Sequence, residues 1–219
     1  MKYSAVLFDL DGTLLNTIGD IAGATNYALE KQGYPTHPDD AYYDMVGWGL
    51  DELCRRALPE GEGKEELIRE LESDWKAYYH DHPADRTEPY EGVEELITAL
   101  VEANIALGVL SNKPDELARK AVEKLLPNRY FAVVRGQSEE FPHKPDPSSL
   151  LNILEEIQVE PARACLVGDS EIDMETARNA GVGAVAVSWG FRSLEILRDA
   201  GAEVTVHSTL ELRRYLLDN

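Results

Sequence analysis

The chain has 219 residues, enough for one large domain or for a core with a smaller insert, and 43% of them are hydrophobic, as in ordinary soluble globular proteins. A formal net charge of −20 argues against nucleic acid as a partner, because phosphate backbones need a basic footprint. No apolar run approaches the roughly 20 residues of a membrane span, and the N-terminus lacks a signal-peptide layout. We therefore expect no membrane partner. The two cysteines lack the spacing of metal ligands, so we expect core thiols and a cytoplasmic location.

A buried strand followed by two carboxylates opens the chain. The apolar run 5–8 predicts a strand buried on both faces, and Asp9, Asp11 and Gly12 come directly after it. Side chains two apart on an extended backbone point the same way, so both carboxylates can face the space beyond the strand. Two acids there repel each other unless a cation or a shared proton lies between them. On this stretch alone, an ordinary turn remains an open interpretation.

A helical block follows residue 15 and continues for about 70 residues. A loose apolar stripe from 18 to 29 predicts one helix, and the segments 39–46 and 50–58 predict two more. A fourth helix carries an apolar side chain at every fourth position, at Leu67, Leu71, Trp75 and Tyr79. These side chains define one helix face, which indicates that they pack in a core.

This helical block is predicted to be an inserted domain. It lies between the first strand and the rest of the chain, and the segment 81–89, which holds two prolines, is typical of a linker. We therefore expect an all-helical cap at 16–85. Residues 1–15 and 86–219 are expected to form the catalytic α/β core.

From residue 90 onward helices and strands alternate. Strands are expected at 105–110, 131–134, 164–167, 183–187 and 204–206, and helices at 93–103, 115–125, 146–157, 171–180, 194–200 and 210–217. Such alternation predicts an α/β fold, a Rossmann-like and mainly parallel sheet with helices on both faces.

Polar residues follow several of these strands, where ligands of open α/β sheets bind. The residues at strand ends are Asp9, Asp11, Ser111, Asn112, Lys113, Asp169 and Ser170, and Lys144 lies on a loop before a helix. Mg²⁺ prefers oxygen ligands and one or two carboxylates, which suits Asp9 and Asp169. Asp173, one helical turn after Asp169, could hold a metal-bound water or brace Lys144.

Each of these residues also has a simpler interpretation. Asp169 and Asp173 could be acids favoured at a helix N-terminus, and Ser111 could be a helix cap. Lys144 could be a solvated loop residue. Their joint occurrence at successive strand ends favours a site for phosphoryl chemistry.

The same residues resemble the four motifs of the haloacid dehalogenase superfamily of phosphohydrolases. The motif DxDGT stands at 9–13, a strand followed by Ser at 109–113, K-P-x-P at 144–147 and GDxxxD at 168–173. All four follow the family's order, and the resemblance covers the whole chain, including a helical cap between the first two motifs. Within the superfamily the chain is similar to the phosphoglycolate phosphatases.

The resemblance implies a Mg²⁺-dependent phosphatase that hydrolyses a small, phosphoglycolate-like phosphomonoester through an aspartyl-phosphate. It implies that Asp9 is the nucleophile, that Asp11 is the acid and base, and that Ser111 and Lys144 complete the catalytic set. Mg²⁺ would be held by Asp9, by the backbone carbonyl of Asp11 and by Asp169, with Asp173 behind these ligands.

The substrate-binding residues expected from the resemblance belong to the core motifs and to one cap loop. They are Gly12, Thr13, Gly47, Trp48, Gly49, Ser111, Asn112, Lys113 and Lys144. The partner is expected to be a small phosphorylated metabolite, and the protein a monomer or small homo-oligomer.

Two other functions remain open on the motifs. A sugar-phosphate mutase of the β-phosphoglucomutase kind shares all four of them. A non-enzymatic phospho-acceptor module also places acids, a hydroxyl and a lysine at strand ends. Asp11 favours a phosphatase or a mutase over a dehalogenase, since a dehalogenase has no leaving alcohol to protonate.

Overall fold

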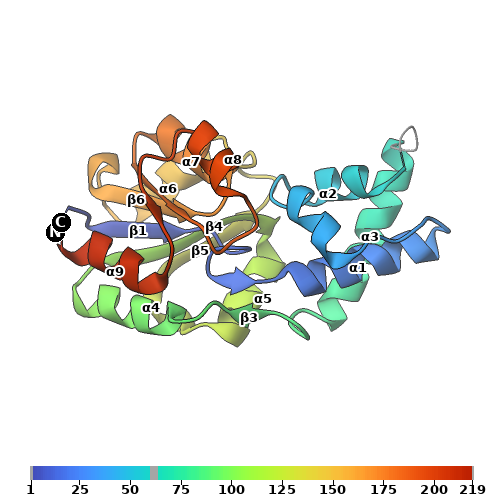
Figure 1. Ribbon diagram of the computed structural model, residues 1–219, viewed down its shortest axis with the longest axis horizontal. Helices are drawn as coiled ribbons and strands as arrows, with labels where there is room; N and C mark the ends of the chain where they lie inside the picture. The colour runs from blue at the N-terminus through green and yellow to red at the C-terminus, as the bar shows by residue number, and fades with distance from the viewer. Residues whose placement is uncertain (1, 60–63, 219) are drawn as a thin grey trace.

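In the part of the chain that the structure describes, six parallel strands form the central sheet (Figure 1). The structure is a computed structural model and describes residues 2–59 and 64–218. The strand order is β5-β4-β1-β6-β7-β8, with β1 at Ala5–Phe8, β4 at Ala106–Pro114, β5 at Phe131–Gln137, β6 at Ala164–Gly168, β7 at Gly183–Val187 and β8 at Thr205–Val206. The predicted α/β fold is confirmed.

Helices cover both faces of this sheet (Figure 1). One face carries α4 (Val93–Glu102), α5 (Asp115–Leu125) and α9 (Thr209–Asp218), and the other carries α6 (Ser148–Glu156), α7 (Glu171–Ala180) and α8 (Leu194–Asp199). Short 3₁₀ turns at Asn128–Tyr130 (η2) and Pro161–Arg163 (η3) complete the connections. Strand β1 is apolar throughout because Val6 and Phe8 pack in one layer while Ala5 and Leu7 pack in the other.

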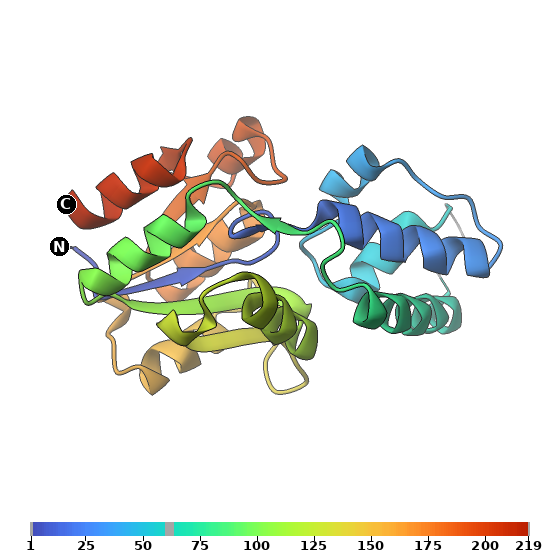
Figure 2. The same cartoon turned by 90° about the horizontal axis from the view of Figure 1, so that it is seen from below.

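Among the described residues, four further helices form a second lobe beyond one end of the sheet (Figure 2). They are α1 (Ile18–Lys31), the 3₁₀ helix η1 (Asp39–Asp44), α2 (Leu50–Ala57) and α3 (Glu65–Asp81). The lobe has its own apolar cluster, in which the rings of Trp75 and Tyr79 stack with centroids 4.5 Å apart. The buried face of α3 includes Ile68, and Leu67 is only half-buried. That this lobe is a separate domain bounded at 16 and 85 stays a prediction.

The two chain crossings between the lobes form a short ribbon. Strands β2 (Leu15–Asn16) and β3 (Glu88–Pro89) pair in an antiparallel manner, with Leu15 opposite Pro89. The buried carboxylate of Asp20 accepts hydrogen bonds from the backbone N–H of Arg86 and from the hydroxyl of Thr87. Residues 88–89, at the end of the expected linker, thus form a strand. A strand of two residues is too short to show an alternating pattern in the sequence.

Two composition-based expectations also concern the fold. Among residues 2–59 and 64–218, no helix combines the length and the hydropathy that crossing a bilayer requires. Cys54 and Cys165 are both buried with free thiols, as expected for core residues.

Candidate active site

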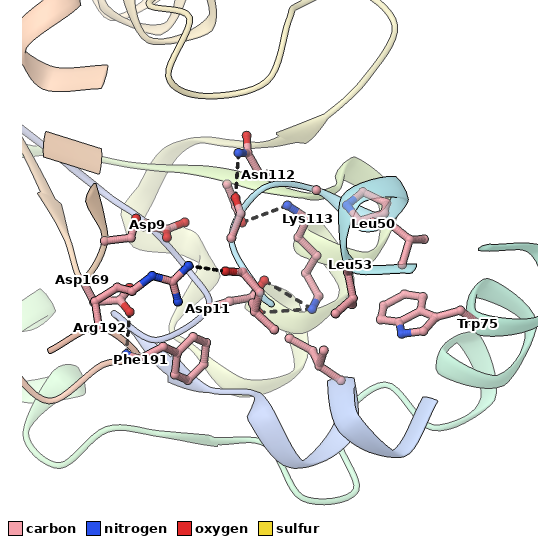
Figure 3. A pocket seen from close by; sticks show the side chains of 17 residues that line it. Asp9, Asp11, Leu50, Leu53, Trp75, Asn112, Lys113, Asp169, Phe191 and Arg192 are labelled. Carbon is pink, nitrogen blue, oxygen red and sulfur yellow. Dashed lines mark hydrogen bonds and ion pairs between the residues drawn. The ribbon is translucent and has the colours of Figure 1, made fainter. Parts of the chain in front are cut away.

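The predicted strand-end residues gather at the edge of the sheet that faces the helical lobe (Figure 3). Because β1 pairs with β6, the ends of these strands bring Asp9 beside Asp169. The backbone N–H of Asp9 donates to the carbonyl of Val167 at 2.9 Å, so the hydrogen bonding between β1 and β6 continues as far as Asp9 itself. Both carboxylates line a pocket between the sheet and the helical lobe.

Three buried carboxylates form the centre of the site. Oxygens of Asp9, Asp169 and Asp173 all lie within 4.8 Å of one another. Burial raises the pKa of Asp9 well above its ordinary value, and the charges of Asp173 and Asp169 raise it further. Burial, followed by the charge of Asp173, raises the pKa of Asp169 to about 7. The three acids therefore need positive charge to be ionised together.

Lys144 supplies part of that charge. Its Nζ lies 2.9 Å from Oδ1 of Asp9 and 2.6 Å from Oδ1 of Asp173, and its side chain is buried. Burial disfavours the ammonium, but the charges of Asp173 and Asp9 outweigh it and raise the pKa of Lys144. One ammonium does not neutralise three carboxylates, so the group keeps a net negative charge. Its ligand atoms are all oxygens, which suits a hard divalent cation such as Mg²⁺. The residues present fit such an ion.

The carboxylate of Asp169 is held from several sides. The hydroxyl of Thr13 donates to its Oδ1 at 2.9 Å, and the backbone N–H of Phe191 donates to its Oδ2 at 2.7 Å. A Cβ at Gly12 or at Gly190 would overlap Asp169, and Gly12 also has a positive φ of 87°. Two glycines thus let the backbone approach the acid closely.

Asp173 caps a helix and braces Lys144 at the same time. Its Oδ2 accepts hydrogen bonds from the backbone N–H of Ser170 at 3.1 Å and from the Ser170 hydroxyl at 2.6 Å, which completes a capping box at the start of α7. Its Oδ1 accepts from Nζ of Lys144. A Cβ at Gly168 would overlap this carboxylate. The geometry shows Asp173 both in the first turn of α7 and as a brace for Lys144, while a role in holding a metal-bound water stays a prediction.

Asp11 lies outside the three-acid group and pairs with Lys113 (Figure 3). Nζ of Lys113 is 3.1 Å from Oδ1 of Asp11 and 4.4 Å from the ring centre of Tyr79. Burial would lower the pKa of Lys113, but the negative charge of Asp11 and the contact with Tyr79 raise it. The lysine is therefore a buried cation at the junction of the two lobes.

Ser111 and Asn112 lie within strand β4, which continues to Pro114 and so extends beyond the predicted 105–110. The hydroxyl of Ser111 accepts from the backbone N–H of Lys113 at 3.2 Å and lines the pocket. The amide of Asn112 donates to the carbonyls of Gly47 and Lys144, and its oxygen accepts from the backbone N–H of Lys144. The amide of Asn112 is thus fully engaged within the protein.

The helical lobe contributes an apolar wall to the pocket. The lining residues from this lobe are Ile21, Val46, Gly47, Gly49, Leu50, Leu53 and Trp75. Trp48 is not one of them, and its ring lies 5.6 Å from the guanidinium carbon of Arg56. A role of Trp48 in substrate binding stays a prediction.

Sequence reasoning assigned no role to Phe191 and Arg192, which also line the pocket. Both follow strand β7, as Asp9 follows β1 and Asp169 follows β6. Their position after a parallel strand was the available signal.

Fold and site together define a class of protein, a Rossmann-like α/β enzyme with buried acids at its strand ends beneath a helical lobe. The chain belongs to the haloacid dehalogenase-like hydrolase family, whose model matches residues 6–187. This confirms the family that the motifs predicted.

Individual relatives agree with this assignment. The chain is 33% identical over 211 residues to the phosphoglycolate phosphatase of Chromobacterium violaceum, which covers 95% of this chain and 94% of that one. It is 30% identical over 191 residues to the N-acetylmuramic acid 6-phosphate phosphatase of Pseudomonas aeruginosa, with 87% and 84% covered. A crystal structure of a protein from Lactobacillus delbrueckii subsp. bulgaricus superposes with a TM-score of 0.94, at 31% identity and full coverage of both chains.

Proposed function

We propose that the protein is a Mg²⁺-dependent phosphatase that hydrolyses a small phosphomonoester, with phosphoglycolate as the best candidate, through an aspartyl-phosphate. The observation that carries this proposal is the buried group of Asp9, Asp169 and Asp173, in which Asp9 and Asp173 pair with the ammonium of Lys144. Such a group can bind a phosphoryl group and a divalent cation side by side. A cytoplasmic location and a monomeric or small homo-oligomeric state accompany the proposal as predictions.

The proposed reaction has two steps that share Asp9 and Asp11. A carboxylate oxygen of Asp9 attacks phosphorus, the bond from phosphorus to the leaving oxygen breaks, and Asp11 donates a proton to the alcohol that departs. Asp11 then accepts a proton from water, which attacks phosphorus and breaks its bond to Asp9. Inorganic phosphate leaves, Asp9 is again a carboxylate, and Asp11 is again the carboxylic acid with which the reaction began.

The surrounding residues hold the phosphoryl group. The Ser111 hydroxyl and the backbone N–H groups near Asp11 would bind its oxygens, and Lys144 would offset its charge. A Mg²⁺ ion held by Asp9, by the backbone carbonyl of Asp11 and by Asp169 would supply further positive charge against the phosphoryl oxygens. Asp173 keeps Lys144 in place.

The pocket walls support a small acidic leaving group. The wall formed by the helical lobe is apolar, and Nε1 of its Trp75 already donates to the Thr25 hydroxyl at 3.1 Å. The hydroxyls of a sugar would lose hydrogen bonds to water there without replacement. Lys113, by contrast, could pair with a carboxylate such as that of phosphoglycolate. This observation favours the phosphatase over a sugar-phosphate mutase.

A turnover panel tests the proposal. Phosphate release with Mg²⁺ would be followed on phosphoglycolate, a hexose 1-phosphate and a nucleoside monophosphate. We expect many turnovers per chain and the highest kcat/KM on phosphoglycolate. Isomerisation of the hexose phosphate as the preferred reaction would establish the mutase instead, and a single stoichiometric phosphorylation would establish the phospho-acceptor module.

A further inference from the structure

Arg192 connects the sheet to the helical lobe. It follows strand β7, and its side chain is buried. Its guanidinium donates to the backbone carbonyls of Tyr43 and Val46, the latter at 2.7 Å, and its Nε donates to Glu171 at 2.9 Å. The carbonyl of Tyr43 lies in the last turn of η1, where the peptide dipoles present their negative ends, and that of Val46 lies two residues beyond the helix. A cation from the sheet thus binds the free end of a helix in the other lobe.

The residue before Arg192 contacts both lobes as well. The ring of Phe191 packs against that of Tyr43, with centroids 5.6 Å apart. The backbone N–H of Phe191 donates to Oδ2 of Asp169. Adjacent residues therefore bind the helical lobe and a carboxylate of the acid cluster, so displacement of one end would move the other.

Asn112 makes a second connection of the same kind. One amide N–H group reaches the carbonyl of Gly47 at 2.9 Å, directly after the segment that Arg192 binds. The same amide binds the backbone of Lys144 through both its nitrogen and its oxygen, at 3.0 and 2.8 Å. Lys144 in turn pairs with Asp9. Segment 43–47 is thus connected to Asp169 through Arg192 and Phe191, and to Lys144 through Asn112.

We propose that Arg192 is a positioning residue that latches segment 43–47 of the helical lobe onto the sheet. Through Phe191 the latch ties the closed arrangement of the lobes to the orientation of Asp169, and Asn112 ties it to Lys144. Hydrogen bonds from a guanidinium are about twice as strong as neutral ones, which suits Arg192 as the main connection. The kinetic test of this inference rests on the proposed function, whereas the test by hydrogen exchange does not.

The latch has a consequence that depends on substrate size. The pocket walls come from both lobes, so a small ester is enclosed only while segment 43–47 is docked. A large, activated ester such as p-nitrophenyl phosphate needs less enclosure, because its good leaving group requires less help from the pocket. Loss of the latch should therefore penalise the small substrate selectively.

The experiment compares wild type with Arg192→Gln and Arg192→Lys. The matched control is Arg119→Gln, which removes only an exposed ion pair with Asp115. The first readout is amide hydrogen exchange over segment 43–49, which needs no turnover. The second is the split between KM and kcat on phosphoglycolate and on p-nitrophenyl phosphate, and urea unfolding verifies that each variant folds.

We expect faster exchange over 43–49 in Arg192→Gln, an increase in KM for phosphoglycolate of about 10-fold, and a change of less than about 3-fold for p-nitrophenyl phosphate. Arg192→Lys should lie between wild type and Arg192→Gln, since an ammonium keeps the charge but not the fork. Unchanged exchange in both variants would overturn the latch. If wild type hydrolyses neither ester, the proposed function fails while exchange still decides the latch.

Discussion

Lys113 and Asp11 form a buried ion pair, with Nζ 3.1 Å from Oδ1, at the point where the helical lobe meets the sheet. Tyr79 of the helical lobe covers the same ammonium. The pair joins the proposed acid to the proposed receptor for a substrate carboxylate. A carboxylate entering the pocket would therefore compete with Asp11 for Lys113, so the charge of the substrate bears directly on the acid.

Lys113→Met should separate acidic from neutral substrates. Methionine keeps the length and apolar contacts of the side chain but cannot pair with a carboxylate. Loss of one charge-assisted hydrogen bond is expected to lower kcat/KM for phosphoglycolate by about 10- to 100-fold. Ethyl phosphate, which has no carboxylate, should report only the effect of removing the counter-ion of Asp11 and should therefore lose less than phosphoglycolate, and the exposed Lys76→Met should leave both unchanged. An equal loss on both esters would assign Lys113 a role unrelated to the substrate carboxylate.

Asp9→Asn should reduce kcat more than Asp11→Asn. Removal of the nucleophile is expected to reduce kcat by about 10³-fold or more, because no aspartyl-phosphate can form. Removal of the acid should cost about 10²-fold or more while Mg²⁺ binding persists. Steady-state phosphate release measures both effects, and thermal melting verifies the fold. Full turnover in the Asp9 variant would exclude it as the nucleophile.

Metal removal should affect both activity and stability. Chelation by EDTA is expected to abolish turnover, and added Mg²⁺ should restore it. Since the ion would bind only the folded state, saturating Mg²⁺ should raise Tm by about 5 °C. In Asp169→Asn the increase should disappear. A melting temperature independent of Mg²⁺ in wild type would argue against the three-acid group as its site.

Substitution of Gly190 should weaken metal binding, whereas substitution of Gly23 should stabilise the fold. A Cβ at Gly190 would overlap Asp169, so Gly190→Ala should displace this carboxylate and weaken Mg²⁺ binding, measured by calorimetry. Gly23 lies inside α1 with open space where a Cβ would stand. Gly23→Ala should therefore stabilise the fold by about 0.5–1 kcal/mol in urea titrations. Wild-type metal affinity in Gly190→Ala would contradict the close packing around Asp169.

Acid stability should depend partly on Asp115. Burial opposes its ionisation, but hydrogen bonds from Arg119 at 2.6 Å and from the backbone of Gly136 at 2.8 Å lower its pKa below the ordinary value. A carboxylate with a lowered folded pKa stabilises the fold above its unfolded pKa of about 4, and this contribution disappears as pH falls through the folded pKa. Asp115→Asn should reduce the free energy of unfolding at pH 7 but much less near about pH 3. An equal reduction at both pH values would refute this assignment.

Much of the fold could be predicted because its signals are local. The helices at 115–125 and 171–180 and the strand at 183–187 have their predicted bounds. The second of these helices begins with a capping box at Ser170 and ends at Gly181 in the left-handed region, so both of its ends are written in neighbouring residues. The buried face of α3 was predicted less accurately than its existence. With 3.6 residues per turn, Ile68 can occupy the buried face in place of the predicted Leu67.

The parts that escaped prediction depend on distant contacts. Asp9, Asp169 and Lys144 could be grouped because each follows a recognisable strand or motif. The bonds of Arg192 to the carbonyls of Tyr43 and Val46 join positions more than 140 residues apart and leave no local pattern.

The ribbon of β2 and β3 has a consequence for how such enzymes can change. Because Leu15 and Pro89 are paired, the helical lobe leaves and rejoins the core at almost the same point. An insertion whose ends lie together can be exchanged for another without disturbing the strands that carry the acids. The helical lobe and the strands that carry the acids could thus be inherited separately, as long as a new lobe offers carbonyl partners to Arg192 and Asn112.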